Sequence, residues 1–352
     1  MKKIKFILYF LIISLILKFI PFAFKTVSAS EVSKGECVIE VNSLRVLDSY
    51  NENKKLYPAS TTKILTALTV IENFDLNKEI TVPKSCVGTP GSSIYLRENE
   101  RLKVIELLYG LMLRSGNDCA ECLSTAFTSR NDFIALMNKT AKKCGALNSN
   151  FTNPHGLHDN NHYTTAYDLA LISAKAMKND VFKKIVSTKS IKISNDGYDY
   201  DRVLINKNKM LKSYDGCNGI KTGYTEKAGR CLVSSALKNN MEVISVVLNC
   251  PDMWNRSTIL LDNAYNNYKI YQLFNRETLN NKVFKDKNGN SFTINFDKSF
   301  NYPLKEGEKD DITFKFNGKN LENFIKNPEN NGVFEIFIKN KLIFSQNIFI
   351  II

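Results

Sequence analysis

Apolar residues recur every three or four positions over several long stretches of the chain, which is the period of an amphipathic helix. Shorter stretches alternate apolar and polar residues or are continuously apolar, as strands are. The pattern predicts a helix that begins after Pro58 and helices over residues 104–114, 118–127, 132–144, 167–178 and 257–274. It predicts strands within residues 37–49, 80–83, 219–224, 230–237 and 242–248. Mixed helices and an antiparallel sheet of this kind indicate an α+β fold.

The C-terminal part of the chain differs, because from about residue 275 apolar residues alternate with polar ones and glycines and prolines mark frequent turns. Its last stretch, residues 333–352, is predicted to form two strands joined by a polar turn at Lys339-Asn340-Lys341. We therefore expect an α+β domain over residues 30–274, followed by a small all-β domain over residues 275–352. The total of 352 residues fits two ordinary domains.

The first 29 residues have the three parts of a secretory signal peptide. Three lysines supply the positive region, Phe6 to Leu17 forms an apolar core, and small residues end at Ala29, after which cleavage is expected. The alternative is an uncleaved membrane anchor, but Lys18 interrupts an apolar run that is shorter than the roughly 20 residues a spanning helix needs. We therefore expect a secreted, extracytoplasmic protein at the cell wall or the outer face of the cytoplasmic membrane.

The chain carries 48 basic and 35 acidic residues, a formal net charge of +13. Five basic residues and no acidic ones lie in the predicted signal peptide, so the mature chain keeps 43 basic against 35 acidic residues, a net charge of +8. No run of basic residues interleaved with aromatic ones predicts nucleic-acid binding. Dispersed positive charge suits carboxylate-bearing substrates or peripheral association with an anionic wall or membrane surface, and simple solubility explains it equally well.

Eight cysteines are an even number, which permits disulfides in a secreted chain. A chain of this length does not need them for stability. Cys119 and Cys122 have the spacing of a redox motif, but they fall inside a predicted helix without the strand–helix–strand context of such motifs. We therefore expect buried thiols that stay mostly reduced.

Ser60 and Lys63 stand three residues apart at the start of the predicted helix that follows Pro58. Positions three apart share one face of a helix, so the two side chains can touch. A serine hydroxyl needs a neighbouring base to act as a nucleophile, and a lysine can be that base if burial or a second cation lowers its pKa. On its own, the spacing is more typical of a capping serine beside an unrelated lysine.

Two later segments change that interpretation. Ser115-Gly116-Asn117 follows a predicted helix, and Lys221-Thr222-Gly223 lies in a predicted strand. A closely related trio of segments, with aspartate in the middle of the second, is the signature of penicillin-binding proteins and class A β-lactamases. The three segments lie far apart in the sequence, and we expect them to line one cleft.

In such a cleft, Ser60 would attack a carbonyl carbon. Lys63 would take the serine proton, and the like charge of Lys221 nearby would help to keep Lys63 neutral. On the opposite wall, Ser115 would relay a proton and Asn117 would bind the amide of the substrate. The predicted catalytic residues are therefore Ser60, Lys63, Ser115 and Asn117.

The predicted strand supplies the substrate-binding side of the cleft. Lys221 and Thr222 would bind the terminal carboxylate of a substrate, and an edge strand could also pair with an extended peptide. Gly223 would let that peptide approach closely. The backbone N–H groups of Ser60 and Tyr224 would form an oxyanion hole.

The chain has three histidines, His155, His158 and His162, within or just after the segment Asn153-Pro154-His155-Gly156-Leu157. Zinc takes imidazole ligands, so these histidines are a candidate metal site. Their spacing fits none of the helical zinc motifs, and the proline and glycine of the segment favour a loop. We therefore expect no metal.

Together these segments make the chain resemble the low-molecular-mass penicillin-binding proteins that are serine D-alanyl-D-alanine carboxypeptidases. The resemblance covers almost the whole mature chain and rests on residues 58–63, 115–118, 153–157 and 219–225. It implies a catalytic domain with the fold shared by serine β-lactamases and penicillin-binding proteins, followed by the β-rich second domain of the family. Gly116 stands where class A β-lactamases usually carry aspartate, and no Glu-x-x-Leu-Asn segment supplies their deacylating base.

The resemblance implies removal of the terminal D-alanine from the pentapeptide of peptidoglycan through an acyl-enzyme on Ser60, without a cofactor. β-Lactam antibiotics are expected to acylate the same serine. Lys207 stands where some relatives have arginine, and it is a candidate to bind carboxylate as a point charge rather than as a fork. The apolar end, Ile350-Ile351-Ile352, is expected not to be the amphipathic anchor helix of many relatives.

Three other functions stay open at this point. A β-lactamase would hydrolyse β-lactams rapidly, whereas a carboxypeptidase would release D-alanine and hydrolyse its penicilloyl ester slowly. A catalytically silent penicillin-sensing or peptidoglycan-binding protein is disfavoured by the complete set of catalytic residues. A zinc carboxypeptidase would lose its activity to a chelator rather than to a β-lactam.

Overall fold

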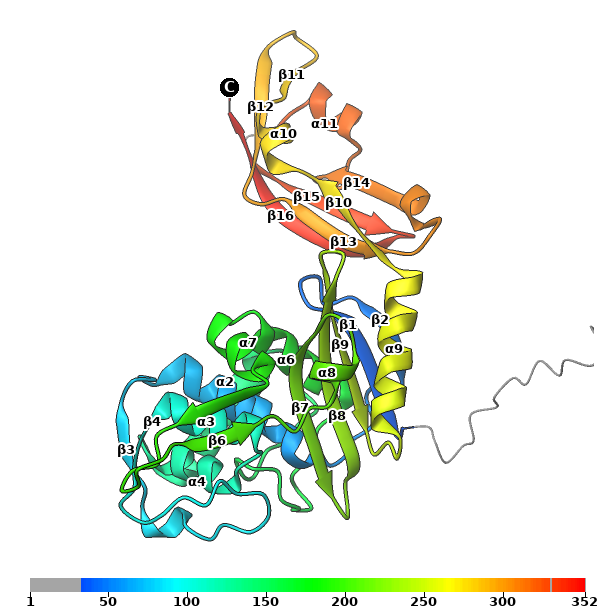
Figure 1. The fold of residues 1–352 in the computed structure, drawn as a ribbon. Coiled ribbons are helices and arrows are strands. Elements are labelled where there is room, and N and C mark those ends of the chain that lie inside the picture. Colours follow the sequence, from blue (N-terminus) through cyan, green and yellow to red (C-terminus); the bar gives the residue numbers. More distant parts are fainter. Residues whose placement is uncertain (1–32, 330, 352) are drawn as a thin grey trace, which may run out of the picture. The chain divides into compact units, whose positions relative to one another are not determined.

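A five-stranded antiparallel sheet runs through the part of the chain that carries the predicted catalytic segments (Figure 1). The computed structural model describes residues 33–329 and 331–351. Neighbouring strands of the sheet follow the order β2-β1-β9-β8-β7, so β7 lies at one edge. The strands are β1 (Gly35–Glu40), β2 (Val46–Tyr50), β7 (Cys217–Thr225), β8 (Gly229–Lys238) and β9 (Met241–Leu248).

The strand β9 shows why the sheet needs cover on both faces. All of its residues are buried, and successive side chains point to opposite faces of the sheet. Ile244 and Val246 belong to one hydrophobic core, whereas Val243 and Val247 belong to a second one. The second core is closed by α9 (Met253–Asn267), which packs on the sheet from the other side (Figure 1).

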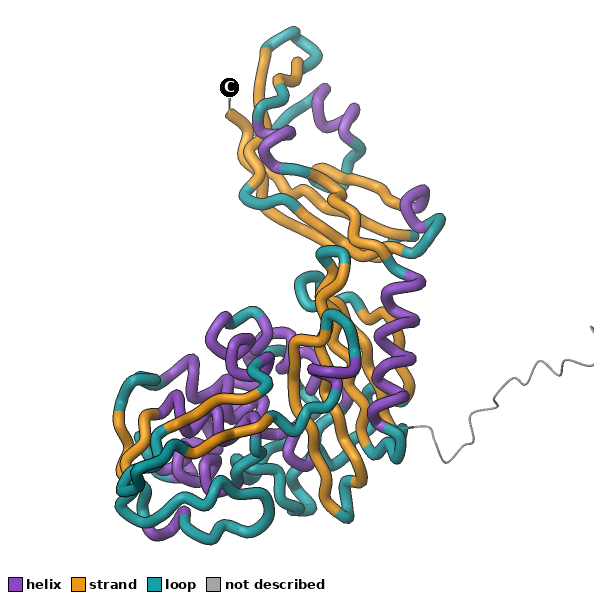
Figure 2. The backbone as a smooth tube through the Cα atoms, in the orientation of Figure 1, coloured by secondary structure: helices purple, strands orange, loops and turns teal. Residues whose placement is uncertain are grey.

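The first core is built from helices, and α2 (Lys63–Asn73) lies at its centre. Its first eight residues, Lys63 to Val70, are all buried. It packs among the helices α3, α4, α5, α6 and α7, which gather on one side of the sheet (Figures 1 and 2). Their bounds are α3 (Val104–Leu113), α4 (Asn117–Thr125), α5 (Arg130–Lys143), α6 (Ala166–Met177) and α7 (Asp180–Ser187).

Shorter elements connect these helices and the sheet. Two small antiparallel pairs join β3 (Glu79–Thr81) to β4 (Arg101–Lys103) and β5 (Ser190–Ile193) to β6 (Arg202–Ile205). A single helical turn, α8 (Met210–Ser213), precedes β7.

The C-terminal part forms a second five-stranded sheet, in the order β11-β12-β16-β15-β14, with its own core rich in phenylalanine. A separate pair joins β10 to β13, and two short helices, α10 (Arg276–Asn280) and α11 (Leu321–Lys326), complete this part. The strands are β10 (Lys269–Phe274), β11 (Val283–Lys285), β12 (Ser291–Phe296), β13 (Phe300–Leu304), β14 (Ile312–Phe316), β15 (Asn331–Ile338) and β16 (Lys341–Ile351).

The α+β class and the two terminal strands predicted from the sequence are confirmed. Phe334, Ile336 and Ile338 of β15 are buried, as their alternation with polar neighbours predicts, and the turn after them lies at Lys339 and Asn340. No helix among the described residues is long and apolar enough to cross a membrane. The predicted signal peptide, residues 1–29, lies outside the described residues.

The prediction of one helix over residues 257–274 is wrong at its end. α9 ends at Asn267, Tyr268 is extended, and residues 269–274 form β10. Ile270, Tyr271 and Phe274 have spacing that also fits a helix, but their backbone pairs with β13, about thirty residues further along the chain. Because this pairing is not local, the period of the sequence does not reveal it. The domain boundary at residue 275 stays a prediction.

Candidate active site

Ser60 lies on a 3₁₀ turn, η2 (Ala59–Thr62), and Lys63 is the first residue of α2. One turn of a 3₁₀ helix takes three residues, so the two side chains lie on one face. Lys63 Nζ is 3.1 Å from Ser60 Oγ. The structure therefore brings together the two residues that their spacing in the sequence pairs.

The turn that carries Ser60 packs directly against the loop of residues 153–157. Gly156 has a φ of +86°, a conformation that favours glycine. A Cβ added there would lie 1.8 Å from the backbone oxygen of Ala59, so no other residue fits without a backbone shift. Ala59 itself has a φ of +49°, which is uncommon for a residue with a side chain. The loop and the turn consequently fix each other's position.

Lys63 is completely buried, and its amine contacts three neutral oxygen atoms. Besides Ser60 Oγ, these are Asn117 Oδ1 at 2.6 Å and the backbone oxygen of His155 at 2.7 Å. Burial, followed by the charge of Lys221, lowers the pKa of Lys63 well below its ordinary value. A neutral amine has two N–H bonds and one lone pair. In this neutral form, the N–H bonds go to Asn117 and His155, and the lone pair is left to accept from the Ser60 hydroxyl.

Ser115 lies in the turn between α3 and α4, and Asn117 is the first residue of α4; both are on the wall of the site opposite β7. The Asn117 amide nitrogen donates to the backbone oxygen of Pro90 at 2.6 Å, which turns its oxygen toward Lys63. Ser115 has a φ of +63°, and such a conformation in a non-glycine residue is often found at functional sites. Among the described residues, the Ser115 hydroxyl makes no direct hydrogen bond to Ser60 or Lys63.

The buried carboxylate of Asp118 anchors this wall, a role that the sequence does not indicate. It accepts hydrogen bonds from the Ser93 hydroxyl at 2.5 Å and from the backbone N–H groups of Ile94 and Leu96, each at 3.1 Å. These bonds tie the loop before β4 to the first turn of α4. The wall is therefore held by side-chain bonds to backbone rather than by a strand ladder.

The edge strand β7 brings Lys221, Thr222, Gly223 and Tyr224 to the other side of Ser60. A Cβ added at Gly223 would lie 2.9 Å from the backbone nitrogen of Ser60, so glycine lets the strand approach the nucleophile turn closely. Lys221 is buried, and its amine donates to the oxygen of Thr222 at 2.9 Å. Burial lowers the pKa of Lys221 to about 7, and Tyr224 is exposed.

Lys207 also reaches the site, from the segment before α8. Its amine donates to the Ser92 hydroxyl at 3.0 Å, and the Ser92 backbone oxygen accepts from the N–H of Asn117 at 2.7 Å. Its charge is one cause of the lowered pKa of Lys221. Burial, followed by the charge of Arg114, lowers the pKa of Lys207 itself. Several cations therefore crowd one end of the site.

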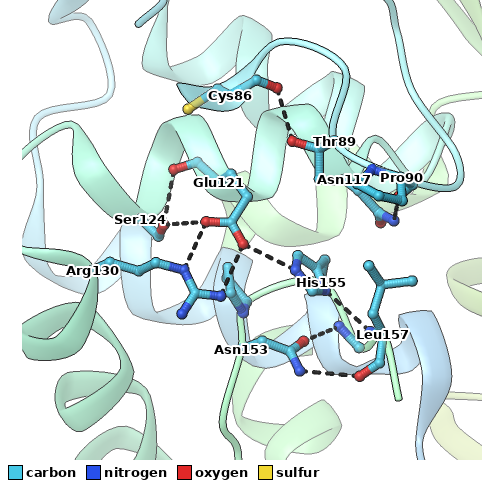
Figure 3. A network of polar contacts seen from close by, with 12 residues as sticks. Cys86, Thr89, Pro90, Asn117, Glu121, Ser124, Arg130, Asn153, His155 and Leu157 are labelled. Carbon is cyan, nitrogen blue, oxygen red and sulfur yellow. Dashed lines mark hydrogen bonds and ion pairs between the residues drawn. The ribbon is translucent and has the colours of Figure 1, made fainter. Parts of the chain in front are cut away.

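A second network adjoins Lys63 through His155, and the sequence did not single out its other members, Glu121 and Arg130 (Figure 3). The carboxylate of Glu121 on α4 bonds to Arg130 through two nitrogens, at 2.9 and 3.0 Å. It also lies 2.9 Å from Nε2 of the His155 ring. Burial opposes ionisation of Glu121, but hydrogen bonds from His155 and Arg130 outweigh it and lower its pKa to about 2. No sequence pattern links these partners, because they come from three separate segments.

The three histidines of the sequence have separate roles in the structure. His162 Nε2 lies 2.8 Å from the Thr62 hydroxyl, and its Nδ1 accepts from the N–H of Thr152 at 3.0 Å. The His158 ring packs edge-on against Tyr57. Within residues 33–329 and 331–351, no three histidine, cysteine, aspartate or glutamate residues are arranged to hold a metal ion.

The cysteines lie mostly in the interior. Cys119 and Cys122 are buried free thiols on α4, and burial raises the pKa of Cys119. Their redox state in solution stays a prediction. Further free thiols are Cys37, Cys86, Cys144, Cys217 and Cys231.

Comparison with known sequences agrees with the motifs that line the site. The S11 peptidase family model, described as D-alanyl-D-alanine carboxypeptidase, matches residues 23–252. The D-alanyl-D-alanine carboxypeptidase DacF of Bacillus subtilis is 33% identical over 293 residues, which cover 79% of this chain and 75% of the relative. The carboxypeptidase DacA of Haemophilus influenzae is 30% identical over 307 residues, covering 81% of this chain and 76% of the relative.

Comparison with solved structures supports the fold. Penicillin binding protein 5 from Haemophilus influenzae matches with a TM-score of 0.75 at 24% identity, covering 92% of this chain and 98% of that chain. A variant of the Streptomyces K15 DD-transpeptidase matches with a TM-score of 0.63 at 29% identity, covering 68% of this chain and 100% of that chain. The fold expected from the resemblance is thereby confirmed for both the catalytic and the β-rich part.

Proposed function

Because the chain belongs to the D-alanyl-D-alanine carboxypeptidase family, we propose that Ser60 is the nucleophile with which it removes the terminal D-alanine from peptidoglycan stem peptides. The observation that carries this proposal is the environment of Lys63. A buried amine with a lowered pKa lies 3.1 Å from the Ser60 hydroxyl and donates both of its N–H bonds elsewhere. Such an amine is a base aimed at one serine.

In the acylation step, Ser60 Oγ attacks the carbonyl carbon of the bond between the last two D-alanines, and the serine proton passes to Lys63. The backbone N–H groups of Ser60 and Tyr224 stabilise the negative charge on the carbonyl oxygen. Ser115 relays the proton from Lys63 to the nitrogen of the departing D-alanine. The peptide bond breaks as the ester forms, and no cofactor takes part.

In the second step, water hydrolyses the ester. Lys63 removes a proton from the water, the water oxygen bonds to the ester carbonyl carbon, and the proton returns to Ser60 as the shortened peptide leaves. β-Lactams form the same kind of ester on Ser60. Their acyl group stays attached for longer, because the opened ring keeps its leaving group in the site.

The carboxylate of the terminal D-alanine binds to Lys221, Thr222 and Lys207. With a pKa of about 7, Lys221 is only partly charged before substrate arrives. A bound carboxylate favours its cationic form. Asn117 contributes its second amide N–H to the substrate, since one N–H is already donated to Pro90.

The experiment that tests this function measures three rates on the same preparation: D-alanine release with a β-lactam present, D-alanine release with a chelator present, and hydrolysis of the penicilloyl ester. D-Alanine release from a pentapeptide should be lost with a β-lactam and retained with a chelator. Hydrolysis of the bound penicilloyl ester should be slow. Rapid β-lactam turnover without D-alanine release would identify a β-lactamase. Penicillin binding with neither β-lactam turnover nor D-alanine release would identify a silent sensor.

We further propose that the protein works outside the cytoplasmic membrane and is held to the envelope by peripheral contacts. The predicted net charge of +8 after cleavage at Ala29 suits anionic wall polymers, and such contacts weaken at high salt. Fractionation should therefore release the protein with salt. Release with detergent only, with residues 1–29 still present, would identify that segment as an anchor.

A further inference from the structure

The direction of the Lys63 lone pair depends on the two oxygen atoms that accept its N–H bonds, and each of these oxygens must be held in place by other contacts. The first acceptor, the oxygen of the Asn117 amide, is oriented by the bond from the same amide to Pro90. The second is the backbone oxygen of His155, which belongs to an irregular loop rather than to a helix or strand. What holds that oxygen 2.7 Å from Lys63 must therefore come from contacts of the loop itself.

The ring of His155 provides such a contact, and its hydrogen bonds define which nitrogen carries the proton. Nδ1 accepts from the N–H of Leu157 at 3.1 Å, so in the neutral ring Nε2 carries the hydrogen. Nε2 then donates to the Glu121 carboxylate at 2.9 Å. The pKa of His155 is lowered, chiefly by burial, so the ring is neutral. Its contact with Glu121 is therefore a hydrogen bond to a charged acceptor.

Glu121 is itself firmly placed. It lies on α4, one turn after Asn117, and Arg130 at the start of α5 grips both of its oxygens. The side chain of His155 is 8% exposed and that of Glu121 is 14% exposed. The charges that act most strongly on the Lys63 amine belong to other residues, chiefly Lys221. The effect of Glu121 on Lys63 is therefore one of geometry.

We propose that Glu121 is a positioning residue for the catalytic base: through the His155 ring it fixes the backbone oxygen that aims the Lys63 lone pair at Ser60. The chain of contacts runs from Arg130 to Glu121 and to His155 (Figure 3), and the backbone oxygen of His155 then accepts from Lys63. The proposal rests on the proposed roles of Ser60 and Lys63. It adds that α4 supports the base twice, once through Asn117 and once through Glu121.

The test is the variant Glu121→Gln, followed by the rate of penicillin acylation under rapid mixing. Glutamine keeps the shape but places an NH₂ group against donors of Arg130 or His155. The loop oxygen should then shift, and a misplacement of about 1 Å in a reacting geometry can cost on the order of 100-fold. We expect the acylation rate constant at saturating penicillin to fall about 10- to 100-fold. The dissociation constant of the initial complex should not change, because Lys221 and Thr222 are untouched.

Glu36→Gln is the matched control. Glu36 is another buried carboxylate, gripped by two nitrogens of Arg256 at 2.7 and 2.6 Å, but it lies on β1, away from the Ser60 site. The control should lower the thermal midpoint and leave the acylation rate constant unchanged. If Glu121→Gln is folded and acylates at the wild-type rate, or if both variants slow acylation equally, the positioning role is refuted.

A second measurement keeps the test decisive if glutamine prevents folding. Glu121, Arg130 and His155 line a cavity of about 480 Å³, which gives small ions a route to the site of a deleted side chain. In Glu121→Ala, added acetate should restore acylation in a saturable way, because its carboxylate can accept from both Arg130 and His155. It should not change the rates of wild type or of Glu36→Ala. No recovery with acetate in a folded Glu121→Ala variant would contradict the proposal.

The result also separates this inference from the proposed function. If penicillin labels wild type at a residue other than Ser60, the proposed function fails first. If wild type is labelled at Ser60 while the Glu121 variants react at the wild-type rate, only the positioning role fails.

Discussion

Replacing Gly156 by alanine tests whether the loop that carries His155 is built against the nucleophile turn. At a φ of +86° a side chain adds strain of about 1–3 kcal/mol. The new Cβ would lie 1.8 Å from the oxygen and 2.4 Å from the carbon of the Ala59 carbonyl. These are backbone atoms that no rotamer change can move, so the overpacking costs about 1–3 kcal/mol more. We expect the free energy of unfolding to fall by about 2–6 kcal/mol.

The matched control for this prediction is Gly197→Ala. Gly197 has a φ of +81°, but nothing lies within 4 Å of its added Cβ, so it tests strain without the close contact. Urea denaturation measures both losses of stability, and penicillin acylation measures whether Ser60 has moved. Gly156→Ala should lose more stability than the control and should acylate slowly. Equal losses, with full activity in Gly156→Ala, would refute the close packing of loop and turn.

Three further predictions concern the base, the buried imidazole and the thiols. Lys63→Ala should slow acylation even at saturating substrate, whereas Lys221→Ala should raise KM as well as lower kcat; unchanged acylation in Lys63→Ala would overturn its role as base. Burial lowers the pKa of His162 from 6.5 to about 3, so the unfolded chain binds the proton first as the pH falls. The stability that neutral His162 contributes above pH 6.5 should therefore be lost as the pH falls toward 3. The urea midpoint of His162→Gln should fall less steeply over this range than that of wild type, and equal slopes would contradict this prediction. Thiol counting in denaturant without reductant should find mostly free cysteines, and fewer than two would contradict this.

The nucleophile and its base could be predicted from sequence because their contact is local. Ser60 and Lys63 are separated by one turn, and the apolar period that follows them defines the helix. The alternation around Phe334 likewise predicts which side of β15 is buried, because strand geometry fixes it within a few residues. Motif resemblance extended the prediction to Ser115, Asn117 and Lys221, whose roles remain proposals.

The contacts that hold Lys63 in position could not be predicted in this way. The second acceptor of the Lys63 amine is the backbone oxygen of His155. Every residue has a backbone oxygen, so the identity of residue 155 does not reveal this contact. The partner of its ring, Glu121, lies 34 residues earlier on a helix whose pattern indicates only which face is buried. The end of α9 was mispredicted for the same reason, since the pairing of β10 with β13 is a tertiary contact.

The central claim is that Ser60 forms the acyl-enzyme, and mass spectrometry of the penicillin-treated protein tests it most directly. Cleavage after lysine releases the peptide Leu56–Lys63, in which Ser60 is the only serine. That peptide should gain the mass of one penicillin, and Ser60→Ala should stay folded, bind no penicillin covalently and release no D-alanine. A penicilloyl group on any other peptide, or labelling that persists in folded Ser60→Ala, would contradict the account.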